Sequence, residues 1–149
     1  MMIPESIHDE VRIDASPARV WTVLTEAEHL AAWFAFDGAE IDLRPGGAMV
    51  FRWKEEGVFH ARIEAIEPQR KLSFRWALLP DVAPTEGNAN LVEFTLTADG
   101  AGTLLRVDES GFRELHGSDD DRAGHVRDNR MGWEGALSTL VKHLDASAA

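Results

Sequence analysis

The sequence predicts an α+β fold in which a curved, antiparallel, seven-stranded sheet packs around a long C-terminal helix. Apolar and polar residues alternate with a period of two in seven strand-like segments, six of which follow one another through short turns. Two short helical patterns separate the first strand from the other six, and a long helical pattern ends the chain. Because these helices are too few to cover a flat sheet, we expect the sheet to curve around the long helix and leave a hollow.

The first three elements are a strand and two short helices. Apolar and polar residues alternate over residues 9–14, which is typical of a half-buried strand. Ser16 and Pro17 then predict a helix start, because serine caps the free amides and proline suits the first helical position. A second helix follows at once, since Thr25 and Glu28 have the spacing of a capping box.

The middle of the chain has the pattern of a six-stranded meander. The alternating apolar residues centre these strands on residues 41–43, 49–53, 59–65, 72–76, 92–96 and 105–109. Pro45, Gly46 and Gly47 form the first turn, and Ile66 breaks the alternation in the way that a β-bulge does. Residues 79–90 are rich in Pro, Gly and Asn and predict a longer loop, which we expect to act as a gate to the hollow.

The last element is a long helix that begins near Ser118, where three aspartates follow a serine able to cap it. One helical stripe is apolar and comprises Val126, Trp133, Leu137, Leu140 and Leu144. The same segment contains Gly124, Gly132 and Gly135, and each glycine costs about 1 kcal/mol relative to alanine in a helix. These glycines predict a close approach to another backbone, a kink, or a helix that begins later than Ser118.

Composition argues against several classes of function. The 149 residues, 44% of them hydrophobic, suit a single domain over residues 1–149 with a continuous core. A formal net charge of -11 without a basic run disfavours nucleic acids and anionic membrane surfaces, and no apolar run approaches membrane-spanning length. The lack of Cys and of a visible targeting signal predicts a cytoplasmic protein. The six histidines are scattered without metal-ligand spacing, so we expect neither a metal nor a cofactor.

Five motifs, taken in order along the chain, carry a family resemblance. They are Ala15-Ser16-Pro17 with Val20-Trp21, Asp42-Leu43-Arg44-Pro45-Gly46-Gly47, Ile66-Glu67-Pro68 with Arg70-Lys71-Leu72, Glu109-Ser110-Gly111-Phe112, and Asn129 with Gly132-Trp133. Their order and spacing resemble the START-like (SRPBCC) superfamily, and more narrowly its branch named after the activator of the heat-shock-protein ATPase. The resemblance implies a helix-grip fold with a cavity between the sheet and the C-terminal helix. It implies less about chemistry, because related members include carriers, cyclases, hormone receptors and co-chaperone modules.

Glu109 is the one ionisable residue that falls mid-strand on the apolar face of the predicted sheet. It lies two residues beyond Val107, so the pleat directs it toward the concave side if the strand stays regular. If the strand instead ends near Asp108, Glu109 lies at a wet rim or pairs with a helix amide. A buried Glu109 without a cation would have a raised pKa, whereas a paired one would remain a carboxylate anchor. Asn129 lies one helical turn before Trp133, so Asn129 can bond Glu109, a ligand or a backbone carbonyl.

The other candidate ligand-binding residues are large aromatic side chains expected on the enclosed face. They either fill the core or form the wall of an apolar ligand site, and both roles are compatible in a helix-grip cavity. These candidates are Trp33, Phe34, Phe51, Trp53, Phe59, Phe74, Trp76 and Phe94, with Trp133 from the C-terminal helix.

Three functions are compatible with this cavity. The first is the binding of a small hydrophobic molecule bearing one polar group, by a carrier, sensor or sequestering protein in which Glu109 is the polar anchor. The second is a cyclase-like or condensation enzyme with Glu109 as general base, for which no second catalytic partner is visible in the sequence. The third is interaction with a chaperone, which rests on the resemblance alone. We favour the first and assign no catalytic residue.

Overall fold

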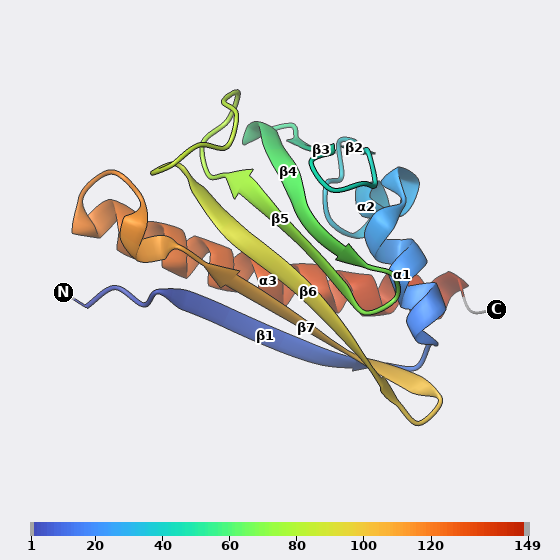
Figure 1. Cartoon of the computed structure of the whole chain (residues 1–149). Helices are drawn as coiled ribbons and strands as arrows, with labels where there is room; N and C mark the ends of the chain where they lie inside the picture. Colours follow the sequence, from blue (N-terminus) through green and yellow to red (C-terminus); the bar gives the residue numbers. More distant parts are fainter. Residues whose placement is uncertain (1, 148–149) are drawn as a thin grey trace.

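The computed structural model describes residues 2–147 and has the predicted order of elements (Figure 1). In chain order these are β1 (Ser6–Ile13), α1 (Pro17–Thr25), α2 (Ala27–Trp33), β2 (Ala39–Ile41), β3 (Ala48–Trp53), β4 (Gly57–Glu67), β5 (Lys71–Ala77), β6 (Ala89–Asp99), β7 (Gly102–Ser110), the 3-10 helix η1 (Phe112–Glu114) and α3 (Asp119–Ser147). Within these residues the strands form a seven-stranded antiparallel sheet in the order β1-β7-β6-β5-β4-β3-β2. The predicted α+β class and the predicted sheet are therefore confirmed.

Helix α3 runs across the curved sheet, and its C-terminal part lies beside α1 (Figure 1). The apolar stripe predicted for α3 is buried, and so are the inward side chains of β3, β5, β6 and β7. The hydrophobic core thus lies between the concave face of the sheet and α3, which is the helix-grip arrangement. None of the helices in residues 2–147 has a stretch long and apolar enough to cross a membrane.

The first short helix begins as predicted, and the second does not. The Ser16 hydroxyl accepts a hydrogen bond from the Arg19 amide at 3.3 Å and so caps α1. Helix α1, however, continues to Thr25, whose hydroxyl donates to the Trp21 carbonyl at 2.7 Å. The predicted capping box at Thr25 is therefore wrong, because this hydroxyl is used one turn back within α1. Glu26 holds the N-cap position of α2 without a side-chain bond.

The strands match the predicted meander with small shifts. Strand β1 begins at Ser6, three residues before the predicted start, because it pairs with β7 along its whole length. Leu43 lies outside β2 and is exposed. The bulge in β4 lies between Ile63 and Ala65 and not at Ile66. The extra residue of a bulge reverses which of the following side chains point inward. In the sequence this reversal becomes visible only at Ile66, where an apolar residue stands in a position expected to be polar.

Helix α3 begins where the sequence predicts. The Asp121 amide donates to the Ser118 hydroxyl at 3.1 Å, and the Ser118 amide donates to the Asp121 carboxylate at 3.0 Å. These bonds lower the pKa of the Asp121 carboxyl and satisfy the free amides of the first turn. The helix therefore does not start late. A Cβ atom added at Gly132 or Gly135 would meet no atom within 4 Å apart from the backbone of its own helix turn, so neither glycine reflects a close approach between two backbones.

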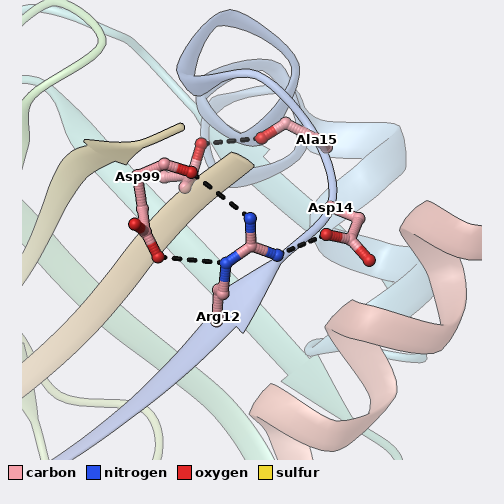
Figure 2. A network of polar contacts seen from close by, with 5 residues as sticks. Arg12, Asp14, Ala15 and Asp99 are labelled. Atoms are coloured by element: carbon pink, nitrogen blue, oxygen red, sulfur yellow. Dashed lines mark hydrogen bonds and ion pairs between the residues drawn. The ribbon is translucent and has the colours of Figure 1, made fainter. Parts of the chain in front are cut away.

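A polar network at the surface ties the end of β1 to the β6–β7 hairpin (Figure 2). The Arg12 guanidinium forms ion pairs with Asp14 and with Asp99, the latter at 3.0 Å, and donates to the Asp99 carbonyl at 3.3 Å. Beside it, the buried Thr103 hydroxyl donates to the Ala15 carbonyl at 2.7 Å. We refer to Arg12, Asp14 and Asp99 as the Arg12 network.

Candidate functional site

A half-open pocket of about 770 Å³ lies between α3, the residues after α2, and the adjoining ends of β3, β4 and β5. We call it the aromatic pocket. Its wall contains seven aromatic side chains, Trp33, Phe34, Phe36, Trp53, Phe59, Trp76 and Trp133. The other lining residues are Glu56, Ala77, Leu78, His125, Asp128, Asn129, Met131, Gly132, Gly135, Ala136 and Thr139. A volume of this size suits a small organic ligand, and an apolar lining with few polar groups is the usual character of such sites.

The aromatic wall is built around Phe34, which follows α2. Its ring stacks on Trp133 with a centroid distance of 5.2 Å and an interplanar angle of 8°. Trp76 stacks on it at 6.0 Å, and Trp53 meets it edge-on at 5.0 Å. Rings from four separate parts of the chain thus support one another, which holds the wall in one arrangement.

Glu109 lies behind this wall with an exposed fraction of 0%. Its Oε2 atom accepts hydrogen bonds from Trp76 Nε1 at 3.0 Å, Asn90 Nδ2 at 2.9 Å and Asn129 Nδ2 at 2.8 Å. Its Oε1 atom accepts one from Trp133 Nε1 at 2.8 Å. We call these five residues the Glu109 cluster. All four donors are uncharged, so the cluster is a buried acid held without a cation.

The electrostatics of Glu109 reflect two opposing effects. Burial raises the pKa of the Glu109 carboxyl, while the four hydrogen bonds favour the charged form and oppose that rise. Burial is the larger effect, so the net shift is upward. Within residues 2–147 the buried Oδ1 atom of Asn90 has no hydrogen-bond partner, so the cluster contains one unsatisfied acceptor.

The structure places the predicted ligand-binding residues in three locations. Seven of them lie at the aromatic pocket, namely Trp33, Phe34, Trp53, Phe59, Trp76, Asn129 and Trp133. Phe51, Phe74 and Phe94 are buried in the core and do not line the pocket. Glu109 contacts the lining residues from behind and does not itself reach the pocket surface. Alternation shows that the aromatic side chains of the strands all point to the concave side of the sheet. It does not show how far along its strand each one lies, and that position decides whether the side chain borders the pocket or fills the core.

Sequence reasoning missed Asn90 and the rim of the pocket. Asn90 falls at the end of the predicted loop but is the second residue of β6, where it pairs with Trp76 of β5. That register could have identified Asn90 as a neighbour of Glu109. At the rim, Phe36 is 58% exposed and Met131 is 67% exposed. None of residues 79–90, which were predicted to form a gate, lines the aromatic pocket; Leu78, immediately before them, does.

Two histidines that are far apart in the sequence meet at the surface between α2 and α3. His29 Nδ1 and His143 Nε2 are 2.8 Å apart, and burial together with the charge of His29 lowers the pKa of His143. Glu26 and Glu28 place carboxylate oxygens within 4.8 Å of a His29 nitrogen. Exposed acidic groups commonly gather in this way without a metal.

The fold and the pocket together define a helix-grip protein with an open aromatic site on the concave side of its sheet. The chain belongs to the family described as Activator of Hsp90 ATPase homolog 1-like protein, whose model matches residues 14–145. This agrees with the resemblance to the START-like (SRPBCC) superfamily. Among the curated proteins, no relative matches the sequence.

Solved structures with the same fold cover most of the chain. Protein MLL2253 from Mesorhizobium loti is 24% identical, with a TM-score of 0.78, and the match covers 97% of this chain and 99% of that one. CalU16 from Micromonospora echinospora is 26% identical, with a TM-score of 0.67 and coverage of 93% and 73%. The Aha1 dimer from Colwellia psychrerythraea is 19% identical, with a TM-score of 0.75 and coverage of 97% and 98%. These similarities support the fold and do not assign a ligand.

Proposed function

We propose that the protein is a cytoplasmic carrier, sensor or sequestering protein that binds a small hydrophobic molecule in the aromatic pocket. The observation that carries the proposal is the presence of Gly132 and Gly135 on the pocket side of α3. Side-chain atoms at these positions would meet open space, so packing does not require glycine at either position. Each glycine nevertheless destabilises the helix by about 1 kcal/mol relative to alanine. Keeping the hollow free for a ligand explains both residues.

The test uses two substitutions at Gly135. Gly135→Leu fills the pocket from a position where a Cβ atom meets nothing, so the variant should fold. Gly135→Ala is the matched control, because it removes the glycine and leaves most of the volume. Both variants should be more stable than the wild type by about 0.5–1 kcal/mol, owing to the higher helix propensity.

Binding should separate the two variants. With 1-decanol as the probe, tryptophan fluorescence and native mass spectrometry should show saturable 1:1 binding to the wild type and to Gly135→Ala. Gly135→Leu should lose that binding while keeping its gain in stability. Equal binding of decanol to the wild type and to Gly135→Leu would contradict the proposed function.

The geometry does not favour Glu109 as a general base. A base must come within hydrogen-bond reach of the proton that it removes, or reach it through one water. Glu109 is fully buried, all of its oxygens accept bonds from the protein, and it does not line the aromatic pocket. We propose instead that Glu109 is a positioning residue, which holds the indoles of Trp76 and Trp133 and the amide of Asn129 at the pocket wall.

Chaperone binding is a second candidate, favoured by the description of the matching family. The variant Gly135→Leu separates it from ligand binding, because filling an inward-facing pocket should not alter a protein-binding surface. Affinity capture on the immobilised wild type and on Gly135→Leu should recover a chaperone equally if this function holds. Recovery from neither protein would argue against it.

A further inference from the structure

The tryptophan N–H groups at the wall of the aromatic pocket are already used inside the protein. Trp33 Nε1 donates to the Val23 carbonyl at 2.9 Å, and Trp53 Nε1 donates to the Phe34 carbonyl at 2.8 Å. The indoles of Trp76 and Trp133 donate to Glu109. An indole has a single donor and no acceptor. The four tryptophans therefore offer a ligand their apolar surface and their π faces, but no hydrogen-bond donor.

Asn129 is the uncharged side-chain amide at the pocket wall, and Glu109 sets its orientation. Asn129 Nδ2 donates to Glu109 Oε2 at 2.8 Å, as an acceptor-rich carboxyl group requires. This bond uses one of the two N–H groups of the Asn129 amide and does not involve its Oδ1 atom, which can accept a hydrogen bond. The Thr139 hydroxyl is likewise used, since it donates to the Gly135 carbonyl at 3.0 Å. The uncharged polar groups thus include acceptors for a ligand, with the second N–H of Asn129 as a donor beside them.

The two carboxylates at the rim add negative charge to the pocket. Glu56 and Asp128 line the pocket, and among its lining residues within the described chain there is no Lys or Arg. Asp128 has an ion pair with Arg127 at 3.7 Å, but the two side chains are 72% and 69% exposed, so water weakens the pair. His125 is the remaining titratable residue of the lining.

We propose that the polar group of the ligand is a positively charged hydrogen-bond donor, such as the ammonium group of an alkylamine, and not a carboxylate. This inference rests on the proposed function and specifies its ligand class. An ammonium group donates to Asn129 Oδ1, is attracted by Glu56 and Asp128, and is stabilised by the π faces of the tryptophans. A carboxylate brought to the same place would meet acceptors and negative charge, and would lose the water that satisfied it.

Three probes of equal chain length test the proposal at pH 7, namely decylamine, 1-decanol and decanoate. They share the apolar tail and differ in the charge and donor capacity of the head. We expect decylamine to bind on the order of tenfold more tightly than decanol at low salt, and decanoate to bind most weakly. Isothermal titration calorimetry and tryptophan fluorescence measure the three affinities. Gly135→Leu should lose decylamine binding as well, which shows that the amine occupies the pocket.

Two double variants of equal net charge test whether the rim carboxylates cause the preference for the amine. Glu56→Gln with Asp128→Asn removes both rim carboxylates, whereas Glu134→Gln with Asp145→Asn removes two exposed carboxylates of α3 that lie outside the pocket lining. The rim variant should bind decylamine more weakly, by about two- to fivefold for each carboxylate, and should bind decanol unchanged. The control variant has the same net charge and should keep the wild-type preference.

The outcomes distinguish this inference from the proposed function. If decanol or decanoate binds as tightly as decylamine, the charge preference is wrong and pocket binding still stands. If no probe binds, the proposed function fails and the inference fails with it. A preference for decylamine that persists in the rim variant or in Gly135→Leu would also overturn the inference, because the amine would then bind elsewhere or be recognised by other groups.

Discussion

Two polar networks lie toward opposite ends of the paired strands β1 and β7, and they differ in exposure. At one end, Ile7 pairs with Glu109, whose carboxyl is fully buried among uncharged donors. At the other, the side chains of the Arg12 network are 48% (Arg12), 85% (Asp14) and 55% (Asp99) exposed. The Arg12 network contains formal ion pairs, whereas the Glu109 cluster contains none among the described residues.

The comparison indicates that the exposure of a polar network, and not its formal charge, decides how much the network contributes to the stability of the fold. Water replaces any partner lost from the Arg12 network, so its ion pairs contribute little. Glu109 and Asn90 are fully buried, so the loss of one member of the Glu109 cluster leaves buried groups unsatisfied. The buried cluster also positions the pocket wall, which gives it a consequence for ligand binding that the surface network does not have.

The largest expected effect is the loss of the acid itself. Glu109→Ala leaves the N–H groups of Trp76, Asn90 and Trp133 without an acceptor and opens a cavity, at a cost of about 4 kcal/mol in the free energy of unfolding. Urea denaturation measures this loss. The neighbouring Asp108→Ala is the control, because Asp108 pairs with Arg106 on the outer face. A comparable loss in both variants would show that burial does not explain the difference.

A smaller effect is expected from the loss of one donor. Trp133→Phe removes the bond to Glu109 Oε1, and Trp33→Phe removes a bond to the neutral Val23 carbonyl. Trp33 and Trp133 are both buried and are both replaced by Phe, so the two variants lose a similar amount of ring packing. We expect costs of about 2 kcal/mol and about 1 kcal/mol respectively, since bonds to an ionisable acceptor are stronger. Urea denaturation of both variants tests this order, and a larger cost for Trp33→Phe would reverse it.

The pH dependence of stability gives a third test. Burial raises the pKa of Glu109 above its ordinary value of 4.5, so the folded protein holds this proton more tightly than the unfolded chain does. The resulting stability is fully present below that ordinary value and is lost as the pH rises through the raised pKa. The stability of the wild type relative to Glu109→Gln should therefore fall across this window. Urea denaturation from pH 4 to pH 8 measures the difference, and a difference independent of pH would contradict the shift.

The smallest effect is expected at the surface. Arg12→Ala breaks the ion pairs with Asp14 and Asp99, and the melting temperature should change by no more than the error of its measurement. Addition of salt should reduce even this change, because exposed charges are screened. Thermal denaturation at low and high ionic strength tests the prediction. A loss approaching that of Glu109→Ala would remove the distinction between the two networks.

Most of the fold could be predicted from local patterns. The period-two alternation identified the strands, the Ser16 cap and the Ser118 cap identified two helix starts, and the stripe of α3 identified its buried face. Where local signals competed, they were less reliable. The Thr25 hydroxyl suits a cap for α2 and equally suits the carbonyl of Trp21, and the length of α1 decided in favour of the carbonyl.

The sequence by itself determined the order of the elements and the helix-grip class, because alternation and helical period assign residues to faces. It left Glu109 open between the concave side and a wet rim, and the structure buries it. The tertiary structure decided what Glu109 meets there. Its four donors lie 19 to 33 residues away along the chain, on β5, β6 and α3. Periodicity assigns a face but carries no information about which distant side chains share it or how deep each one lies. Packing of α3 against the curved sheet therefore placed the acid behind the pocket wall and left the two glycines facing the hollow.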